Sequence, residues 1–358
     1  MSQSAPDTTP ADDEFEEIPW AEATLDERLA QLGNLVVARD IEDSIRKVLD
    51  RVRRARLIYK EPRNVVVFGE TGVGKSDIMA RYLADNPERR VDGCIVRPVL
   101  LVEIRNAATP ASVAKQMLTA LGVDEEFFNV PTTELSRMLK RQLIGQRVEL
   151  SIIDEFNNTL TDNGSHKANR IADWVKDLSK TKTRTSSNPH GTVDEIIPFA
   201  MVGTRKVKGL IDPTTNPELR SITPHIIEID RYRYGTTDEK KAFRDFLNGL
   251  DAQLPFDADS ELGSTFGDKM HLATYGLLRQ VGQIVTYAAE LALHDGSAFI
   301  HEHHLHQSVK DQEAILQSNL ISEDGTKEER ERVVTNPFSP PKLAAENAPA
   351  ARRGFQRK

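Results

Sequence analysis

The sequence has one cysteine, no long apolar run and no excess of positive charge, and each absence excludes a class of protein. Cys94 alone cannot form a disulfide within the chain, and no cysteine cluster has metal-binding spacing, which fits a reducing cytoplasm. No run of about 18 apolar residues occurs. The acidic N-terminus lacks the basic and apolar segments of a signal peptide. We therefore expect a cytoplasmic protein, neither secreted nor inserted into a membrane.

The net charge of −8 means that the whole protein does not attract nucleic acid, so such a contact needs a local basic surface. One candidate is a helix that we predict over 40–59, with Asp40 as its N-cap. It carries six basic side chains: Arg46, Lys47, Arg51, Arg53, Arg54 and Arg56. They form either a solvated face or a contact with the DNA backbone or a neighbouring subunit, and both interpretations stay open.

At 358 residues the chain can form one large core and a smaller domain. We expect a disordered acidic tail at 1–18, an N-terminal helical segment at 19–59, a nucleotide-binding α/β domain at 60–234, a helical lid domain at 235–320 and a flexible tail at 321–358. The last tail contains NPFSPP at 336–341, a candidate docking peptide. A basic loop at 179–192 either contacts phosphates or is a mobile insertion without a binding role.

The α/β domain is indicated by five short apolar runs that are rich in β-branched residues and separated by helical stretches. These runs are Val65–Phe68, Val99–Ile104, Val148–Ile153, Ile196–Val202 and Ile226–Ile229. Because nearly continuous apolar strands are buried on both faces, they predict a parallel sheet flanked by helices. After Gly235, helical runs at Asp238–Leu250 and Leu277–Leu293 predict a small all-helical domain.

The strongest motif is GETGVGKS, which directly follows the strand VVVF. It satisfies the P-loop pattern, in which glycines let backbone amides approach phosphates and the lysine contacts the β- and γ-phosphates. A helix that begins at Ser76–Asp77 would add its N-terminal amides. We therefore predict binding of ATP with Mg²⁺, the metal being held by the Ser76 hydroxyl. The predicted nucleotide-binding residues are Gly69, Glu70, Thr71, Gly72, Val73, Gly74, Lys75, Ser76 and Asp77.

An acidic pair, Asp154 and Glu155, follows the third apolar run in ELSIIDEF. Open parallel sheets bind ligands at the carboxyl ends of their strands, so this pair is expected beside the P-loop. There Asp154 would complete the Mg²⁺ site, and Glu155 would be the general base that activates water. An acidic pair after a strand is often only a helix cap, but the P-loop favours the catalytic interpretation.

Four further residues are candidates for stabilising the γ-phosphate. Thr204 ends the run IPFAMVGT, where it would orient water or phosphate, or else cap the next helix. Arg279, early in an apolar helix, would lean over the γ-phosphate and couple lid closure to the nucleotide, or else it is a surface arginine. Arg220 and Arg231 are candidates for an arginine that acts in trans on a neighbour's ATP.

A run of four histidines near the end of the helical region suggests a zinc site at first sight. The residues are His301, His303, His304 and His306. Because no carboxylate or cysteine partners stand at a defined spacing, we predict a solvated helix start instead.

Together these elements resemble an AAA+ ATPase, and in particular the TniB/TnsC family. The resemblance covers about residues 22–318 and rests on the N-terminal helix, GETGVGKS, the DEF strand end, PFAMVGT and YGLLRQ. Members of this family are bacterial, ATP-dependent regulators of DNA transposition that assemble head to tail on double-stranded DNA and recruit a DDE transposase. The resemblance implies the same nucleotide and Mg²⁺ residues, with Thr204 and Arg279 as sensors.

The resemblance also implies DNA contacts from the loops Arg105–Thr109 and Val130–Thr133. There Arg105, Asn106, Thr132 and Thr133 would donate to phosphate oxygens without reading bases. TPAS at 109–112 and TTEL at 132–135 also look like helix starts, so capping remains the alternative. Relatives carry an Arg-Phe pair shortly before the last strand, whereas here Arg220 lies slightly earlier in RSITPHIIEI.

The function implied by this resemblance is an ATPase that forms a helical filament or ring on duplex DNA and disassembles when ATP is cleaved. Its expected partners are a transposase and a target-selection protein, and its expected place is the bacterial nucleoid. The alternative is a helicase-loader-like AAA+ ATPase that remodels DNA-bound protein partners. A scaffold that leaves ATP uncleaved is disfavoured by the presence of Glu155.

Overall fold

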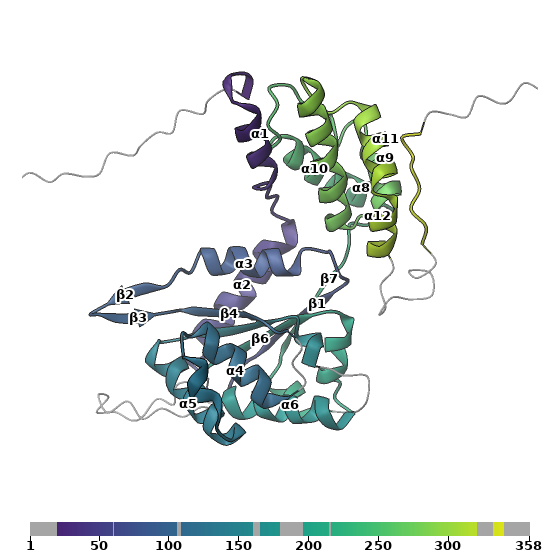
Figure 1. Ribbon diagram of the computed structural model, residues 1–358. Helices are drawn as coiled ribbons and strands as arrows, with labels where there is room; N and C mark the ends of the chain where they lie inside the picture. The colour runs from purple at the N-terminus through teal and green to yellow at the C-terminus, as the bar shows by residue number, and fades with distance from the viewer. Residues whose placement is uncertain are drawn as a thin grey trace, which may run out of the picture.

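The computed structural model describes residues 20–59, 61–105, 109–159, 165–179, 196–214, 216–320 and 332–339. Within these ranges the chain forms an α/β body and a helical lid, which lies above the body in Figure 1. The predicted tail at 1–18, nearly all of the basic loop at 179–192 and most of the tail at 321–358 fall outside the described residues.

The α/β body contains a sheet of five strands within the described residues, in the order β4-β5-β6-β1-β7, and every neighbouring pair is parallel. The strands are β1 (Val65–Gly69), β4 (Val99–Glu103), β5 (Leu150–Asp154), β6 (Phe199–Gly203) and β7 (His225–Ile229). In the centre of the sheet, Val65 lies between Ala200 and His225. All five predicted strands are present, and the predicted parallel α/β fold is confirmed.

Helices cover both faces of this sheet because alternate strand residues feed two separate cores. Val65 and Val67 pack with α2 (Asp40–Ala55) and α3 (Lys75–Ala84), on the lid side in Figure 1. Val66 and Phe68 pack against the other layer, which consists of α4 (Pro110–Ala120), α5 (Thr132–Gly145) and α6 (Ser165–Ser179). Short helices connect these elements: η2 (Glu125–Phe128), η3 (Phe156–Thr159), η4 (Arg205–Ile211) and α7 (Pro217–Ser221).

A two-stranded antiparallel hairpin, which the sequence did not indicate, projects from the body in Figure 1. It consists of β2 (Arg89–Val91) and β3 (Cys94–Val96), joined at Asp92 and Gly93. Both turn residues have positive φ angles of 51° and 78°, as two-residue hairpin turns require. The strands are short, half of their six residues are exposed and only Val96 is buried, so the sequence shows no buried apolar pattern there.

The basic side chains of α2 divide into two groups. Arg46 pairs with Glu42, while Arg53 and Arg56 both pair with Glu149, at 2.7–2.8 Å. The second group, here called the α2 stripe, consists of Lys47, Arg51 and Arg54. Their side chains are exposed and form no ion pair within the described part of the chain. Their spacing places them on one side of the helix. The helix itself begins at Asp40 with Arg39 as N-cap, so the predicted Asp40 cap is wrong by one residue.

The lid consists of α8 (Thr237–Asp251), α9 (Gly267–Thr274), α10 (Leu278–Asp295), α11 (Glu302–Asp311) and α12 (Glu313–Leu320). The N-terminal η1 (Trp20–Glu22) and α1 (Leu25–Leu32) come before it in the chain, and α1 packs against α10. Residues 332–339 return to the lid and bury Val334 and Phe338. Among the described helices, none combines the length and the apolar character that crossing a membrane requires.

Candidate nucleotide site

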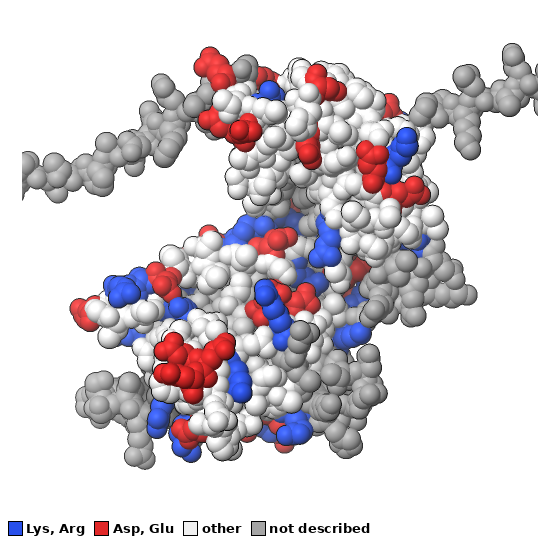
Figure 2. All heavy atoms as spheres, in the orientation of Figure 1, with Lys and Arg blue, Asp and Glu red and all other residues white. Residues whose placement is uncertain are grey.

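A pocket of about 630 Å³ lies between the P-loop and the lid. Figure 2 shows the surface hollowed between these two parts, with Lys and Arg side chains along the hollow and acidic side chains among them. The pocket is lined by Leu32, Gly33, Leu35, Val36, Val37, Arg39, Thr71, Gly72, Gly74, Lys75, Ser76, Asp77, Ile78, Ala80, Arg81, Glu155, Phe246, Leu250, Leu278, Arg279, Gly282 and Thr286. Six of the nine predicted nucleotide-binding residues line it, and Gly69, Glu70 and Val73 do not.

The P-loop turn depends on two glycines with left-handed backbone. Gly72 and Gly74 have φ angles of +85° and +89°, and Gly74 is the N-cap of α3. A Cβ atom on Gly72 would lie 3.0 Å from Cβ of Arg279, and the Arg279 amide donates to the Gly72 carbonyl at 3.0 Å. Glycine therefore provides both the turn conformation and the room for α10 to approach the loop.

Lys75 is held inside the loop. Its Nζ donates to the carbonyls of Gly69 at 3.0 Å and Glu70 at 2.8 Å, and the residue is only 6% exposed. Burial lowers the pKa of Lys75, while the carboxylates of Glu155 and Asp154 act in the opposite direction. The ammonium group thus lies at the base of the loop, where a phosphate oxygen could replace a carbonyl as its partner.

Ser76 and Asp154 are the two predicted metal ligands, and they lie near each other at the end of β5. Asp154 is buried at the end of β5, close enough to the Ser76 hydroxyl for that group to favour the ionised carboxylate. Burial raises the pKa of Asp154, and the Ser76 hydroxyl and the hydrogen bond from the Glu155 amide partly oppose this shift. A buried carboxylate beside a hydroxyl at a phosphate-binding loop is a donor set that suits Mg²⁺, which prefers oxygen ligands.

Glu155 lines the pocket from a strained turn. Its φ is +52°, and its amide donates to Oδ1 of Asp154 at 2.8 Å. A non-glycine residue in this region costs on the order of 1–3 kcal/mol, a kind of strain that is common at functional sites. Asn157, which the sequence analysis missed, donates to Oε2 of Glu155 at 3.1 Å and accepts from the Thr204 amide at 3.0 Å. It therefore connects the ends of β5 and β6.

Thr204 presents a buried hydroxyl without a hydrogen-bond partner in the described part of the chain. It is the N-cap residue of η4, as the alternative predicts, but its side chain makes no capping hydrogen bond. A buried unsatisfied hydroxyl costs about 1–3 kcal/mol, which a ligand or water at this site would recover. The next strand end toward β5 carries Asp154, so Thr204 lies at the same edge of the sheet.

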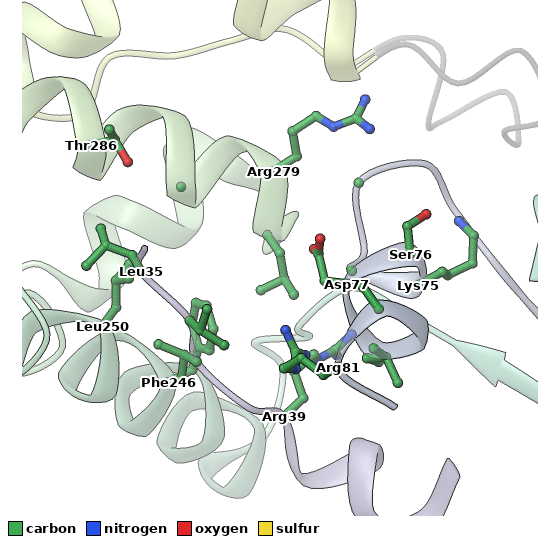
Figure 3. A pocket seen from close by; sticks show the side chains of 18 of the residues that line it. Leu35, Arg39, Lys75, Ser76, Asp77, Arg81, Phe246, Leu250, Arg279 and Thr286 are labelled. Atoms are coloured by element: carbon green, nitrogen blue, oxygen red, sulfur yellow. The ribbon is translucent and has the colours of Figure 1, made fainter. Parts of the chain in front are cut away.

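The three candidate arginines lie in different surroundings. Arg279 packs over Gly72 from the start of α10, and Figure 3 shows its side chain leaving the lid helix. Arg231 contacts the Glu70 carboxylate of its own P-loop at 2.5 Å, which a role in trans would disrupt. Arg220 donates to the Thr223 carbonyl at 2.8 Å, before β7 begins. It therefore lies at the opposite end of β7 from the P-loop of its own chain.

The remaining residues that line the pocket were not predicted from the sequence. Arg39 donates to the carbonyls of Val73 at 3.1 Å and Asp230 at 2.9 Å, and its guanidinium lies 4.6 Å from the centre of the Tyr232 ring. It thereby ties the segment before α2 to the P-loop. Leu35, Phe246 and Leu250 form an apolar side of the pocket (Figure 3). None of these residues belongs to a local motif.

Three of the four predicted DNA-contacting positions, Arg105, Thr132 and Thr133, lie among the described residues, and all three are exposed. The Arg105 side chain is 77% exposed and lies 3.3 Å from Glu103. Thr109 caps α4 together with Ser112, as the capping alternative predicts. Thr132 and Thr133 are exposed in the first turn of α5, so TTEL is a helix start as predicted; the N-cap is Pro131 and no side chain caps the helix, so the capping role is wrong. Asn106 lies outside the described residues.

The histidine run is only partly solvated, because His304 is buried. Its Nδ1 accepts the His301 amide at 3.0 Å, and its Nε2 lies 2.7 Å from the Asp295 carboxylate at the end of α10. Ligand atoms of Asp295, His303 and His304 lie within 4.8 Å of one another. Both ring nitrogens of His304 are already engaged, so this geometry joins α10 to α11 rather than offering a free ligand set.

Comparisons with known proteins agree with this geometry. A family model described as an AAA domain matches residues 58–211. The ORC1-type DNA replication protein 1 of Aeropyrum pernix is 26% identical over 170 residues, which are 46% of this chain and 42% of that protein. The chain therefore matches less than half the length of this curated relative.

Two solved structures from Aeropyrum pernix share the fold. The ORC2 protein with ADPNP and ADP has a TM-score of 0.54 at 15% identity, over 77% of this chain and 68% of that chain. The ORC1 protein in complex with DNA has a TM-score of 0.53 at 18% identity, over 82% and 71% of the two chains. With the P-loop, the acidic pair and the strand order, these matches confirm the predicted AAA+ fold, and residues 58–211 match an AAA domain.

Proposed function

We propose that this chain binds ATP with Mg²⁺ in the pocket between P-loop and lid and hydrolyses it. One observation carries the proposal: Lys75 and Ser76 of the P-loop and the Asp154 carboxylate, which ends β5, lie at the same carboxyl edge of a parallel sheet. The P-loop glycines with positive φ angles, Gly72 and Gly74, and the start of α3 direct backbone amides toward the same point. The apolar side formed by Leu35, Phe246 and Leu250 would receive the adenine ring.

Each residue then has a defined task. Lys75 exchanges its carbonyl partners for phosphate oxygens. The Ser76 and Asp154 oxygens would hold Mg²⁺, which would supply charge neutralisation on the phosphates. Glu155 accepts the proton of the attacking water, while Asn157 keeps its carboxylate oriented. The free hydroxyl of Thr204 donates toward the water or the γ-phosphate.

Arg279 would report the nucleotide state to the lid. Its side chain starts on α10 and packs on the P-loop glycine, so a shift of either part moves the other. A guanidinium over the γ-phosphate would be held there only while that phosphate is present. In this scheme Arg220 contributes to a neighbouring subunit's site, which requires an oligomer.

We further propose that the nucleotide controls assembly on double-stranded DNA. The α2 stripe provides a local basic surface of the kind that a chain with a net charge of −8 needs. Arg105, Thr132 and Thr133 are exposed and can reach phosphate oxygens. Support also comes from the relatives, of which one is named as a DNA replication protein and one was solved in complex with DNA.

The finer proposal is a transposition regulator of the TniB/TnsC type that recruits a DDE transposase and meets a target-selection protein. The alternative is a remodelling ATPase of the helicase-loader type, which the match to an ORC1-type replication protein favours. Stimulation of ATP turnover separates them. If the chain is a transposition regulator, duplex DNA should bind it and stimulate its ATP turnover. If it is a helicase-loader-type ATPase, single-stranded DNA or a protein partner should stimulate turnover instead.

The basic proposal is tested by turnover and DNA binding of wild type and Glu155→Gln. Removing the general base should lower turnover by about 10²- to 10⁴-fold while ATP binding remains. Because cleavage would release the assembly, the variant should also stay longer on duplex DNA. Equal turnover would remove Glu155 from the mechanism, and DNA affinity that ignores ATP would refute the coupling to assembly.

A further inference from the structure

We propose that residues 332–339, here called the strap, hold the lid and the P-loop together, and that Arg332 is a positioning residue of the nucleotide site. The strap follows α12 in sequence and lies on the lid, and its first residue reaches the P-loop. The inference rests on the proposed function, because it concerns how the ATP pocket is kept in shape.

The strap is anchored on the lid by two buried apolar side chains and a set of hydrogen bonds. Val334 and Phe338 are 7% and 3% exposed. The side chain of Gln317 on α12 donates to the Arg332 carbonyl and accepts from the Val334 amide, both at 2.8 Å. Asn336 donates to the His306 carbonyl of α11 at 2.9 Å. An eight-residue segment with these anchors has one defined position on the lid.

From this position Arg332 contacts the P-loop itself. Its Nη1 lies 3.4 Å from Oε1 of Glu70, while Nη2 of Arg231 lies 2.5 Å from Oε2 of the same carboxylate. The Glu70 side chain is only 4% exposed, so both contacts are shielded from water. The Arg332 guanidinium also lies 5.5 Å from the centre of the Tyr275 ring, at the end of α9.

This carboxylate joins three parts of the molecule: the P-loop, the segment after β7 and the strap. The backbone carbonyl of Glu70 is also one of the two that hold Lys75. A displaced Glu70 would therefore move the carbonyl that orients the phosphate-binding lysine. Since the lid supplies Leu278 and Arg279 to the same pocket, the strap fixes the distance between the two walls. A site held in its binding geometry loses less free energy on binding.

The experiment compares full-length wild type with Arg332→Ala and Phe338→Ala, using a fluorescent ADP analogue as probe. Arg332→Ala removes the P-loop contact, and Phe338→Ala loosens the anchor without touching the P-loop. Both should weaken binding of the probe by about three- to tenfold and raise its dissociation rate. Arg137→Ala is the matched control, because it removes an exposed arginine ion pair on α5 and should leave binding unchanged.

A double-mutant cycle with Glu70→Gln tests whether the effect passes through this contact. If it does, Arg332→Ala should weaken the probe much less in the Glu70→Gln background than in wild type. Lys in place of Arg332 should restore part of the affinity, because the charge remains near the carboxylate. Additive losses in the cycle would overturn the assignment of Arg332 to Glu70.

Hydrogen exchange without nucleotide gives an independent measure. Amides of the P-loop at 70–74 should exchange faster in Arg332→Ala and Phe338→Ala than in wild type or Arg137→Ala. If both hydrogen exchange and probe binding are unchanged in the two variants, the proposed role of the strap is refuted, while the proposed function remains intact. If wild type fails to bind the probe, the proposed function fails, and the role of Arg332 at a nucleotide site fails with it.

Discussion

The nucleotide pocket and the predicted DNA-contacting loops share one edge of the sheet but are built in opposite ways. In the pocket, Lys75 and Asp154 are buried, and neighbouring groups of the same chain fix their positions. Arg105, Thr132 and Thr133 are exposed to water. The difference teaches that the pocket is prepared before its ligand arrives. A DNA contact at the loops would instead depend on charge, and therefore on salt.

The largest expected effect comes from Lys75→Ala, which removes the buried cation of the pocket. Truncating one member of a buried charged pair costs about 2–5 kcal/mol, so affinity for ATP with Mg²⁺ should fall by about 100-fold or more. Nucleotide-dependent assembly should be lost with it. Equilibrium binding of a fluorescent ATP analogue measures the change.

Lys115→Ala on α4 is the matched control, because this lysine is exposed and lies away from the pocket. The control should bind the analogue as wild type does. If Lys75→Ala also binds the ATP analogue as wild type does, the buried lysine is not needed for binding, and the difference drawn between the preformed pocket and the solvated loops is wrong.

Thr204→Val tests the unpartnered hydroxyl and should have the next largest effect. Turnover should fall by up to about 100-fold, because one donor to the reacting group is lost. The free energy of unfolding should stay the same or rise, since no hydrogen bond within the chain is broken. Steady-state kinetics and chemical denaturation measure the two quantities. A drop in stability with normal turnover would assign Thr204 to the fold instead of the reaction.

Arg51→Ala and Arg105→Ala probe the solvated side of the comparison and should have effects of only a few fold. Each arginine that contacts a phosphate should, when removed, lower the slope of log K against log salt concentration by about 0.9. Anisotropy with duplex DNA at several salt concentrations measures the slope. Arg137→Ala serves as control, and an unchanged slope would remove the substituted arginine from the DNA surface.

The smallest effect is the pH dependence contributed by the joint between α10 and α11. Burial lowers the pKa of His304, and hydrogen bonds from Ser297 and His304 hold the pKa of Asp295 well below its usual range. As the pH falls through about 6.5, the unfolded chain takes up a proton that folded His304 does not accept until lower pH. The free energy of unfolding should therefore decrease over that window.

His304→Gln removes the titrating group and should flatten this part of the pH profile. Denaturation at pH 7.5 and below, in wild type and variant, measures the difference. A profile that stays the same in His304→Gln would show that other histidines cause the acid sensitivity.

The parts of the fold that the sequence predicted are those with a local pattern. Strands such as Val65–Gly69 are continuous apolar runs, and Gly72, Gly74 and Lys75 stand at the fixed spacing of the P-loop. Asp154 ends β5, as its run predicted, and the carboxyl ends of parallel strands meet at one edge. The structure around these residues could be predicted because it depends on residues close to them in the sequence.

The missed residues act across long sequence distances. Arg39 contacts Val73 and Asp230, and Arg332 contacts Glu70. Each is an ordinary arginine in its own segment, and only the folded chain shows its partner. Asn157 was missed for a related reason, because its task depends on β5 and β6 being neighbours in the sheet.

Calorimetric titration of the full chain with ATP, with and without Mg²⁺, tests the central claim most directly. We expect one saturable site per chain that binds more tightly when Mg²⁺ is present, because the Ser76 and Asp154 oxygens and the phosphates then share the ion. No saturable heat with ATP under either condition would contradict the account.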